Sequence, residues 1–509
     1  MQRPNASAAS ALLALSLLAL HFPPAVAQQS KVAPKLVSTI DESLDYRWSP
    51  DGKSLAVRGY EDVSLYDAAS GKARAVIKVE ALWPLPKSVN FTPDGRTLVV
   101  QTDRVRLYDA ADGRLLREFG ERTSPISIYE KVNQGYTSSE LNSSTGQYED
   151  VQHGPSKEQV LQELPTEYLS DRVISPDGRS LLVRGEAGRA LVYDMGTGAL
   201  RFTLEPLVEP GAKANAAGAA LGEFSPDGRR IVTSHRNRTP RLWDAETGAL
   251  VADLAPQSGA VYGVSFSHDG RYVATTSFDG VVKIWDAAAG KLLHTLGTGA
   301  NKDRHYFAVW NPADDTFVTK TREWQVGVWD ARTGAPVCRL DGNAVKEKFD
   351  LNNTFLFSPD GRLLVTQARN DFDARSFVSF LTPIRDKKRF IAHVWDARTG
   401  APFASLRDTK GRNGADYYRD KFVWNPSGDI LVTAGLTVKL WSRRGELLQE
   451  IEDDPVRQAG LSPDGRLLAY TLDYNVSMAG MTVELAKLLV GKPPKWKPLP
   501  TYVWQIAAN

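Results

Sequence analysis

The chain has 509 residues, of which 42% are hydrophobic and 24% are charged, as is usual for a soluble globular protein. Its formal net charge is +2, whereas proteins that bind nucleic acid or membrane surfaces carry a clear basic excess, so we expect no nucleic-acid partner. The single cysteine, Cys338, excludes an intramolecular disulfide, and we expect it to be a small buried residue of a strand at 335–340.

The N-terminus has the pattern of a secretory signal peptide. Arg3 precedes an apolar run at 11–20 that is too short to span a bilayer, and Ala25-Val26-Ala27 is a small-residue cleavage site. We expect residues 1–27 to be removed, leaving a secreted or periplasmic domain at 28–509; a buried N-terminal helix is the alternative. We expect no membrane span further along the chain.

From residue 49 onward, a turn of the form Ser-Pro-Asp-Gly recurs. Proline presets φ at the second position, aspartate bonds to its own backbone and glycine takes a positive φ, so the turn closes a hairpin. Seven copies lie at 49–52, 92–95, 175–178, 225–228, 267–270, 358–361 and 462–465, and degenerate copies lie at 311–314 and 425–428.

A second motif, an aromatic residue, usually an acid and then a glycine turn, follows each first motif. In the first six copies the acid comes 17 to 19 residues after the start of the preceding turn. Apolar and polar residues alternate between the motifs, which predicts four antiparallel strands, a to d, per repeat. In one repeat we expect them at 260–266, 271–276, 281–285 and 291–296.

Five insertions interrupt this array. Antiparallel order places the a–b and c–d turns at one end of the strands and the b–c and d–a loops at the other. All five insertions fall on the second face, where long loops on a rigid scaffold usually form binding sites. The d–a insertions are 120–167, 206–219 and 407–419, and the b–c insertions are 369–389 and 473–500.

Two of the insertions have a pattern of their own. Segment 120–167 is rich in Ser, Tyr, Gln and Glu, which favours a disordered or partly ordered flap over an eroded tenth blade. Residues 482–490 predict a short amphipathic helix, whose expected role is to pack across the array rather than to bind a partner.

The repeats Trp-Asp-Ala-Arg-Thr-Gly at 329–334 and 395–400 closely resemble the signature of the WD-repeat family. The resemblance covers about residues 35 to 507 and implies an all-β fold, a single β-propeller of four-stranded blades. The Ser-Pro-Asp-Gly turns also resemble those of Tol-associated periplasmic propellers, which suggests a bacterial secreted type. The family's Gly-His is missing and Asp279 matches its acid in one repeat, so we do not expect its Asp–His–Ser–Trp hydrogen-bond network to form completely.

The strand count predicts how the array ends. The ninth c strand, at 502–506, has no d strand after it, while residues 35–40 form a strand without a blade of their own. We expect these two segments to pair and close a propeller of nine blades. Eight blades with one unit serving as a cap is the alternative.

In WD-repeat proteins, partners commonly contact the residue at the mouth of strand a, five positions before each turn. The resemblance therefore implies partner-binding roles for a set of residues that could also be simple rim residues: Lys87, Tyr262, Tyr306, Asp420 and Arg457.

Motifs for catalysis, metal binding and phosphate binding are absent from the sequence. We therefore expect no catalytic residues, no metal and no cofactor, and a monomeric, non-catalytic scaffold for protein or peptide partners. The alternative is a propeller enzyme or small-ligand binder with a site at the mouth of the central channel, because propellers can assemble carboxylates from distant blades.

Overall fold

The computed structural model describes residues 35–43, 45–59, 62–79, 88–102, 104–120, 126–133, 136–141, 148–153, 156–163, 173–184, 189–207, 221–234, 238–299, 304–321, 325–340, 355–367, 390–407, 421–435, 437–451, 456–472 and 499–505. In 126–163 the description is limited to the backbone. Within these ranges, no helix has the length and apolar character needed to cross a membrane.

Most described strands belong to nine antiparallel sheets, which we number I to IX along the chain. Eight of them have four strands, and sheet III has three strands plus a bridge between Ile174 and Leu181. This agrees with the four strands predicted for each repeat.

The first four sheets are as follows. Sheet I contains β2 (Asp45–Trp48), β3 (Ser54–Arg58), β4 (Asp62–Asp67) and β5 (Ala73–Lys78). Sheet II contains β6 (Ser88–Phe91), β7 (Thr97–Gln101), β8 (Val105–Asp109) and β9 (Leu115–Phe119). Sheet III contains β14 (Ser180–Arg184), β15 (Ala190–Asp194) and β16 (Leu200–Leu204). Sheet IV contains β17 (Leu221–Phe224), β18 (Arg230–Ser234), β19 (Arg241–Asp244) and β20 (Leu250–Asp253).

The remaining five continue this order. Sheet V contains β21 (Val261–Phe266), β22 (Tyr272–Ser277), β23 (Val282–Asp286) and β24 (Leu292–Leu296). Sheet VI contains β25 (His305–Trp310), β26 (Thr316–Thr321), β27 (Val326–Asp330) and β28 (Pro336–Arg339). Sheet VII contains β29 (Phe355–Phe357), β30 (Leu363–Gln367), β31 (Phe390–Asp396) and β32 (Pro402–Arg407). Sheet VIII contains β33 (Lys421–Trp424), β34 (Ile430–Ala434), β35 (Val438–Ser442) and β36 (Leu447–Ile451). Sheet IX contains β37 (Val456–Leu461), β38 (Leu467–Leu472), β39 (Leu499–Gln505) and β1 (Lys35–Ser43).

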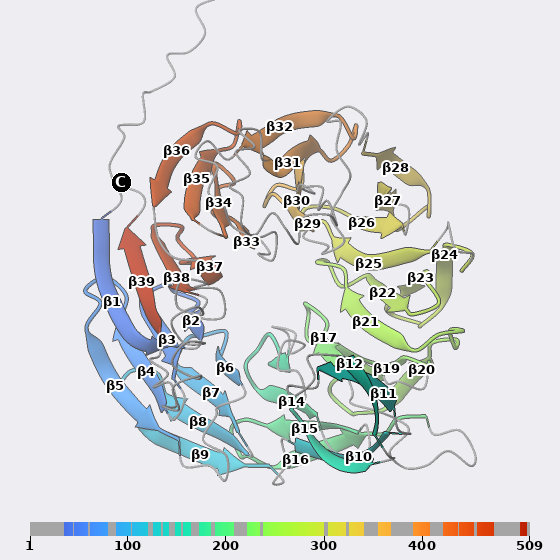
Figure 1. Cartoon of the computed structure of the whole chain (residues 1–509), viewed down its shortest axis with the longest axis horizontal. Helices are drawn as coiled ribbons and strands as arrows, with labels where there is room; N and C mark the ends of the chain where they lie inside the picture. The colour runs from blue at the N-terminus through green and yellow to red at the C-terminus, as the bar shows by residue number, and fades with distance from the viewer. Residues whose placement is uncertain are drawn as a thin grey trace, which may run out of the picture. The chain divides into compact units, whose positions relative to one another are not determined.

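In sheet IX, the N-terminal strand β1 lies antiparallel beside the C-terminal strand β39 (Figure 1). Thr39 pairs with Tyr502 and Ile40 with Thr501. The sequence predicted this pairing, although both strands have other bounds than the expected 35–40 and 502–506. The outer strand of the last sheet therefore comes from the opposite end of the chain.

The Ser-Pro-Asp-Gly turns make the hydrogen bonds that the sequence predicts. In the first turn, Ser49 Oγ donates to Asp51 Oδ1 over 2.6 Å, and the backbone N–H of Lys53 donates to the same oxygen over 3.0 Å. These two bonds lower the pKa of Asp51. Gly52 has a φ of 70°, which a glycine adopts without strain. The same pair of bonds recurs in the turns that begin at Thr92, Ser175, Ser225, Ser267, Ser358 and Ser462.

Hydrophobic clusters join each sheet to the next. Among the described residues there are nine such clusters, and each contains residues from two successive sheets. The last of them packs Ala469 and Val503 of sheet IX against Tyr46 and Leu55 of sheet I. Every sheet thus buries both faces, which a lone four-stranded sheet cannot do.

A second set of contacts joins neighbouring Ser-Pro-Asp-Gly turns. A β-carbon at Gly95 would lie 3.4 Å from Pro50 Cδ of the preceding turn, and one at Gly52 would lie 3.3 Å from Pro463 Cδ of the last turn. We call these the Pro–Gly contacts. They join seven pairs of successive sheets, the other five being Pro93–Gly178, Pro176–Gly228, Pro226–Gly270, Pro359–Gly428 and Pro426–Gly465. The proline and glycine therefore shape their own turn and also fit the next one.

The insertion at 120–167 contains four further strands: β10 (Ile126–Asn133), β11 (Tyr136–Leu141), β12 (Tyr148–His153) and β13 (Ser156–Glu163). β10 pairs with β13 and β11 with β12, in one register from the pair 126–163 to the pair 141–148. The described part of this insertion is thus a two-stranded hairpin, in place of the four-stranded sheet that an eroded tenth blade would form.

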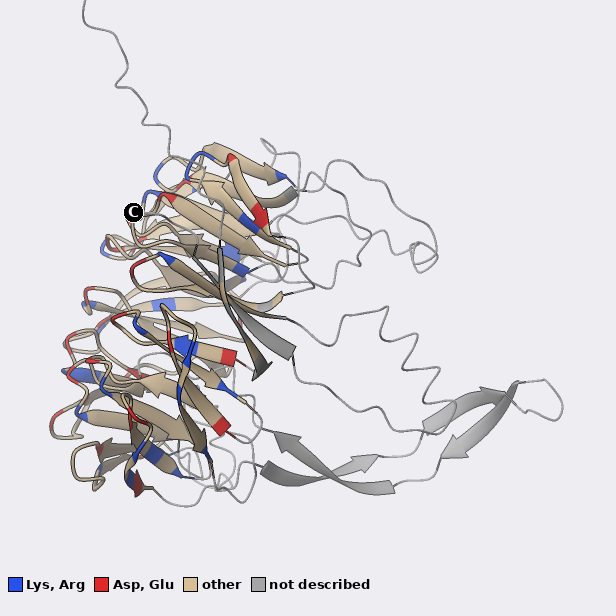
Figure 2. Ribbon diagram, turned by 90° about the vertical axis from the view of Figure 1, so that its left-hand side faces the viewer, with Lys and Arg blue, Asp and Glu red and all other residues tan. Residues whose placement is uncertain are grey.

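The other insertions connect the strands that the sequence predicted. The segments after β30 and β38 join strands b and c, and those after β16 and β32 join strand d to the next strand a. The predicted signal peptide at 1–27 and the predicted helix at 482–490 lie outside the described residues. Over the described sheets, basic and acidic residues are interspersed along the ribbon (Figure 2).

Candidate functional site

The five predicted partner-binding residues fall in three groups. Lys87 and Asp420 lie outside the described residues. Tyr306 and Arg457 are in β25 and β37, where the structure describes their backbone. Tyr262, in β21, is the member of the set whose side chain is described, and it is half-buried. Tyr262, Tyr306 and Arg457 can therefore be described together through their backbone.

The backbone at three predicted positions departs from regular pairing. The register between strands a and b shifts between Val261 and Gly263, between Tyr306 and Val309, and between Val456 and Gln458. A β-bulge of this kind leaves a residue unpaired and changes the direction of its side chain. No such shift occurs where five other strands a pair with their strands b, namely β2, β6, β17, β29 and β33. The sequence pattern gave no signal for these bulges.

Two of the bulged strands bring aromatic side chains together. The ring of Tyr262 lies 4.9 Å from that of Phe278 and 5.9 Å from that of Phe307, measured between centroids. Phe278 is 67% exposed and Phe307 is 37% exposed. We call these three residues the aromatic cluster. It spans two sheets, because Tyr262 and Phe278 belong to the sheet V repeat and Phe307 to sheet VI.

The backbone of Phe307 is in the left-handed region, with a φ of 57°. For a residue with a β-carbon this conformation costs about 1–2 kcal/mol. It occurs within the bulge between Tyr306 and Val309. Such conformations persist where the surrounding structure enforces them, and they concentrate at functional sites.

The b–c turn that presents Phe278 is held from two sides. Asp279 Oδ1 accepts the N–H of Val281 over 2.9 Å, and Asp279 Oδ2 accepts the N–H of Ser258 over 2.9 Å. The carbonyl of Gly280 accepts the N–H of His305 from the next sheet over 2.7 Å. A β-carbon at Gly280, which has a φ of 80°, would collide with Arg304. The turn is therefore fixed to both of the sheets that form the cluster.

In the same two sheets, hydrogen bonds partly replace the network that the sequence predicted to be incomplete. In sheet V, Gln257 Nε2 donates to Thr275 Oγ1 over 2.6 Å, and Trp285 Nε1 donates to the same hydroxyl over 3.0 Å. In sheet VI, Thr319 Oγ1 lies 2.9 Å from His305 Nδ1 and accepts Trp329 Nε1 over 2.9 Å. Gln257 and His305, neither of which belongs to a Gly-His pair, thus take the place expected for the family's histidine.

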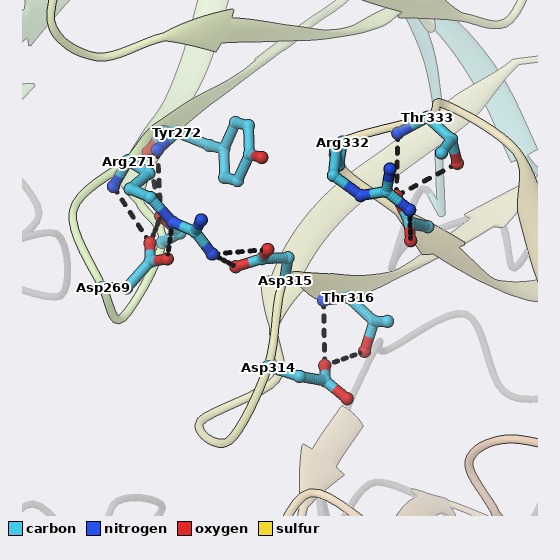
Figure 3. Close-up of polar contacts among 10 residues, drawn as sticks. Asp269, Arg271, Tyr272, Asp314, Asp315, Thr316, Arg332 and Thr333 are labelled. Atoms are coloured by element: carbon cyan, nitrogen blue, oxygen red, sulfur yellow. Dashed lines mark hydrogen bonds and ion pairs between the residues drawn. The ribbon is translucent and has the colours of Figure 1, made fainter.

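On the opposite face, an ion-pair cluster joins the turns of the same two sheets (Figure 3). Arg271 Nη2 lies 2.7 Å and 2.6 Å from the two carboxylate oxygens of Asp315, and Arg271 Nε contacts Asp269. Partial burial opposes ionisation, but hydrogen bonds from Ser267 and Arg271 hold the pKa of Asp269 at about 2. For Asp315, partial burial and the nearby Asp269 raise the pKa although Arg271 opposes them.

The described metal-ligand residue types and the single cysteine were the remaining candidates for chemistry at this site. Within the part of the chain that the structure describes, no three His, Cys, Asp or Glu side chains are grouped closely enough to hold a metal ion. Cys338, which the sequence predicted to be a small buried residue, is half-buried, and its Sγ donates to the carbonyl of Ala397 over 3.3 Å. Burial and the nearby Asp396 raise the pKa of this thiol to about 11, so it is protonated at neutral pH.

Comparisons with known proteins agree with this architecture. Residues 218–244 and 248–286, in sheets IV and V, match the family model of the WD domain, G-beta repeat. The crystal structure of a eukaryotic initiation factor superposes with a TM-score of 0.55 at 12% identity and covers 84% of this chain and 92% of that chain. The fold is all-β and WD40 propeller-like.

Further similarities are partial or have a lower TM-score. The target of rapamycin complex subunit LST8 of Rattus norvegicus is 24% identical over 216 residues, and that of Mus musculus gives the same figures. The match covers 41% of this chain and 65% of the relative. The C-terminal WD40 domain of Sif2 is 14% identical, with a TM-score of 0.47, and the match covers 79% of this chain and 95% of that chain.

Proposed function

We propose that this chain is a non-catalytic WD-repeat scaffold of the bacterial secreted type, which binds a protein partner through the aromatic cluster. The observation that carries the proposal is the exposure of Phe278 and Phe307, from two repeats, around Tyr262. Aromatic side chains supply much of the energy at protein interfaces. The name of the LST8 relatives, which are subunits of a complex, is in keeping with a role in assembly.

The surroundings of the cluster indicate the chemistry of the partner. Arg304 packs against Gly280 beside the cluster, and its Nε donates to the carbonyl of Gly299 over 3.3 Å. The nearby carboxylate of Asp279 is already engaged by backbone donors. Neutral backbone donors leave the negative charge of Asp279 in place but occupy both of its oxygens, so the hydrogen-bond donors that remain for a partner here are the Nη groups of Arg304. We propose that the partner segment is an apolar peptide that also carries a carboxylate.

A displayed peptide library, panned against the purified chain, tests this proposal. We expect enrichment of apolar peptides that contain Asp or Glu. Truncating Phe278→Ala should weaken their binding at least tenfold, because losing an interface anchor costs about 2 kcal/mol or more. Leu250→Ala is the matched control, since Leu250 is 44% exposed on the outer strand β20. Equal binding by both variants would place the site elsewhere.

Two further statements belong to the same proposal. We propose that the nine sheets form one closed, monomeric propeller, which the cluster between sheets IX and I supports. We also propose secretion after cleavage at Ala27, on the strength of the N-terminal sequence. N-terminal sequencing of the protein recovered outside the cytoplasm should begin at Gln28; finding residues 1–27 there would contradict the cleavage, and finding the protein in the cytoplasm alone would contradict secretion.

A further inference from the structure

The contact between the turns of sheets V and VI differs from the seven Pro–Gly contacts. The sheet V turn has His268 at the position where the other eight turns, including the two degenerate copies, have proline. The sheet VI turn has Asp314 where other turns have glycine. Neither half of a Pro–Gly contact is present at this joint, so another interaction must join the two turns.

An ion pair takes that place. Seven turns are followed by an exposed cation, namely Lys53, Arg96, Arg179, Arg229, Arg271, Arg362 and Arg466. At the equivalent position in sheet VI the charge is inverted to Asp315, and Arg271 of the preceding turn contacts both of its oxygens (Figure 3). The side chain of Arg271 is 62% exposed and that of Asp315 is 24% exposed, so water and salt reach the pair.

The two kinds of contact respond differently to salt. Van der Waals contact between proline and glycine is insensitive to ionic strength. An exposed ion pair is screened, because the Debye length falls from about 10 Å at 0.1 M salt to about 3 Å at 1 M. Salt therefore acts on the V–VI joint and leaves the Pro–Gly joints unchanged.

We propose that the Arg271–Asp315 pair is an electrostatic latch, which loosens the turn edge between sheets V and VI as ionic strength rises. The same two sheets carry the aromatic cluster at their other end. Loosening the latch changes the relation between Phe307 and its partners on sheet V, so the latch regulates that surface. This last step rests on the proposed binding function, whereas the latch itself does not.

Hydrogen exchange measured by mass spectrometry on the whole chain, at about 0.02 M and about 1 M sodium chloride, tests the latch. The reporting amides are those of Gly270, Asn311 and Ala331, whose N–H groups bond within or next to the two turns, the last to the carbonyl of Asp315. After correction for intrinsic rates, we expect their exchange to rise about 1.4- to 5-fold with salt, as an exposed pair allows. The equivalent amides of Gly95 and Gly228 should not change.

Variants give the matched comparison. Asp315→Asn should exchange at the high-salt rate already at low salt, and Asp315→Glu should keep the salt response. Asp360→Asn is the control, because it breaks a similar pair between sheets VII and VIII, Arg443–Asp360 at 2.7 Å, where the Pro359–Gly428 contact remains. Salt-independent exchange at the V–VI turns of the unmodified chain, or an equal effect of Asp360→Asn, would overturn the latch, whatever the peptide library shows.

Discussion

The joint between sheets IX and I and the joint between sheets V and VI connect the same kind of sheet by different means. At the first, the buried Tyr46 hydroxyl donates to the carbonyl of Ala469 over 2.5 Å, and Pro463 packs on Gly52. At the second, Tyr272 stacks on Trp310, and an exposed ion pair replaces the turn contact. A repeated fold can therefore keep its geometry while one joint exchanges steric fit for charge.

The largest expected effect on the free energy of unfolding comes from removing apolar contact between β1 and the joint of sheets IX and I. Ile40 is 3% exposed and belongs to the cluster between sheets IX and I. Ile40→Ala should lower the free energy of unfolding by about 2–5 kcal/mol, measured by urea denaturation. Val76→Ala, at a site 55% exposed on β5, should change it by less than about 0.5 kcal/mol. Similar values for the two would mean that β1 adds little to the joint.

A pair of Tyr→Phe variants isolates the buried hydrogen bond of the IX–I joint. Tyr46→Phe deletes the donor to the carbonyl of Ala469 and should cost about 1–3 kcal/mol, the penalty for leaving a buried polar group unsatisfied. Tyr272→Phe makes the same change at the V–VI joint, where the Tyr272 hydroxyl has no hydrogen bond to a described residue, and should cost less than about 0.5 kcal/mol. Thermal unfolding of both variants gives the comparison, and a reversed order would contradict it.

The smallest expected effect is a difference between the two joints in acid, where the turn aspartates lose their contribution to the free energy of unfolding. The pKa of Asp269 is about 2 in the folded chain against an ordinary 3.8, and that of Asp51 is also lowered. A lowered carboxyl pKa gives stability that is present above pH 3.8 and is lost as the pH falls towards 2. Asp269→Asn should flatten this loss more than Asp51→Asn, because Asp269 also contacts Arg271.

Both effects on the free energy of unfolding should stay below about 1 kcal/mol, since these carboxylates are screened by solvent. Urea titrations between pH 2 and pH 5 would measure them. A steeper acid loss in Asp269→Asn than in the unmodified chain would show that relief of Asp315, whose pKa is raised, outweighs the lost bonds.

The sequence predicted those features that depend on local turn chemistry and strand alternation. The Ser49 and Asp51 pattern defined the hairpin, and counting strands from such turns paired residues 35–40 with the last strand. Contacts between repeats could not be predicted in this way. The contact of Pro463 with Gly52 depends on how two turns that are distant in the sequence approach each other, and the sequence of a single repeat does not determine this.

For the candidate site, the sequence indicated Tyr262 but not its companions. Phe307 reaches the cluster through a bulge and a left-handed backbone, which no propensity signals for a phenylalanine. The sequence did not indicate Gln257 and His305 as partners of the strand b threonines, because neither residue belongs to a Gly-His pair. Their proximity to Thr275 and Thr319 follows from tertiary packing.

In the eight sheets before the last, the pairing of strands c and d slips just before the aromatic residue of strand c. Each outer strand is therefore kinked where it starts, opposite residues such as Trp285 or Tyr66. An extended strand from another molecule could form regular backbone hydrogen bonds with such an outer strand over a short stretch only, because the kink shifts the register. The outer strands are thus a poor template for fibre growth, even though each of them is the last strand of its sheet among the described residues.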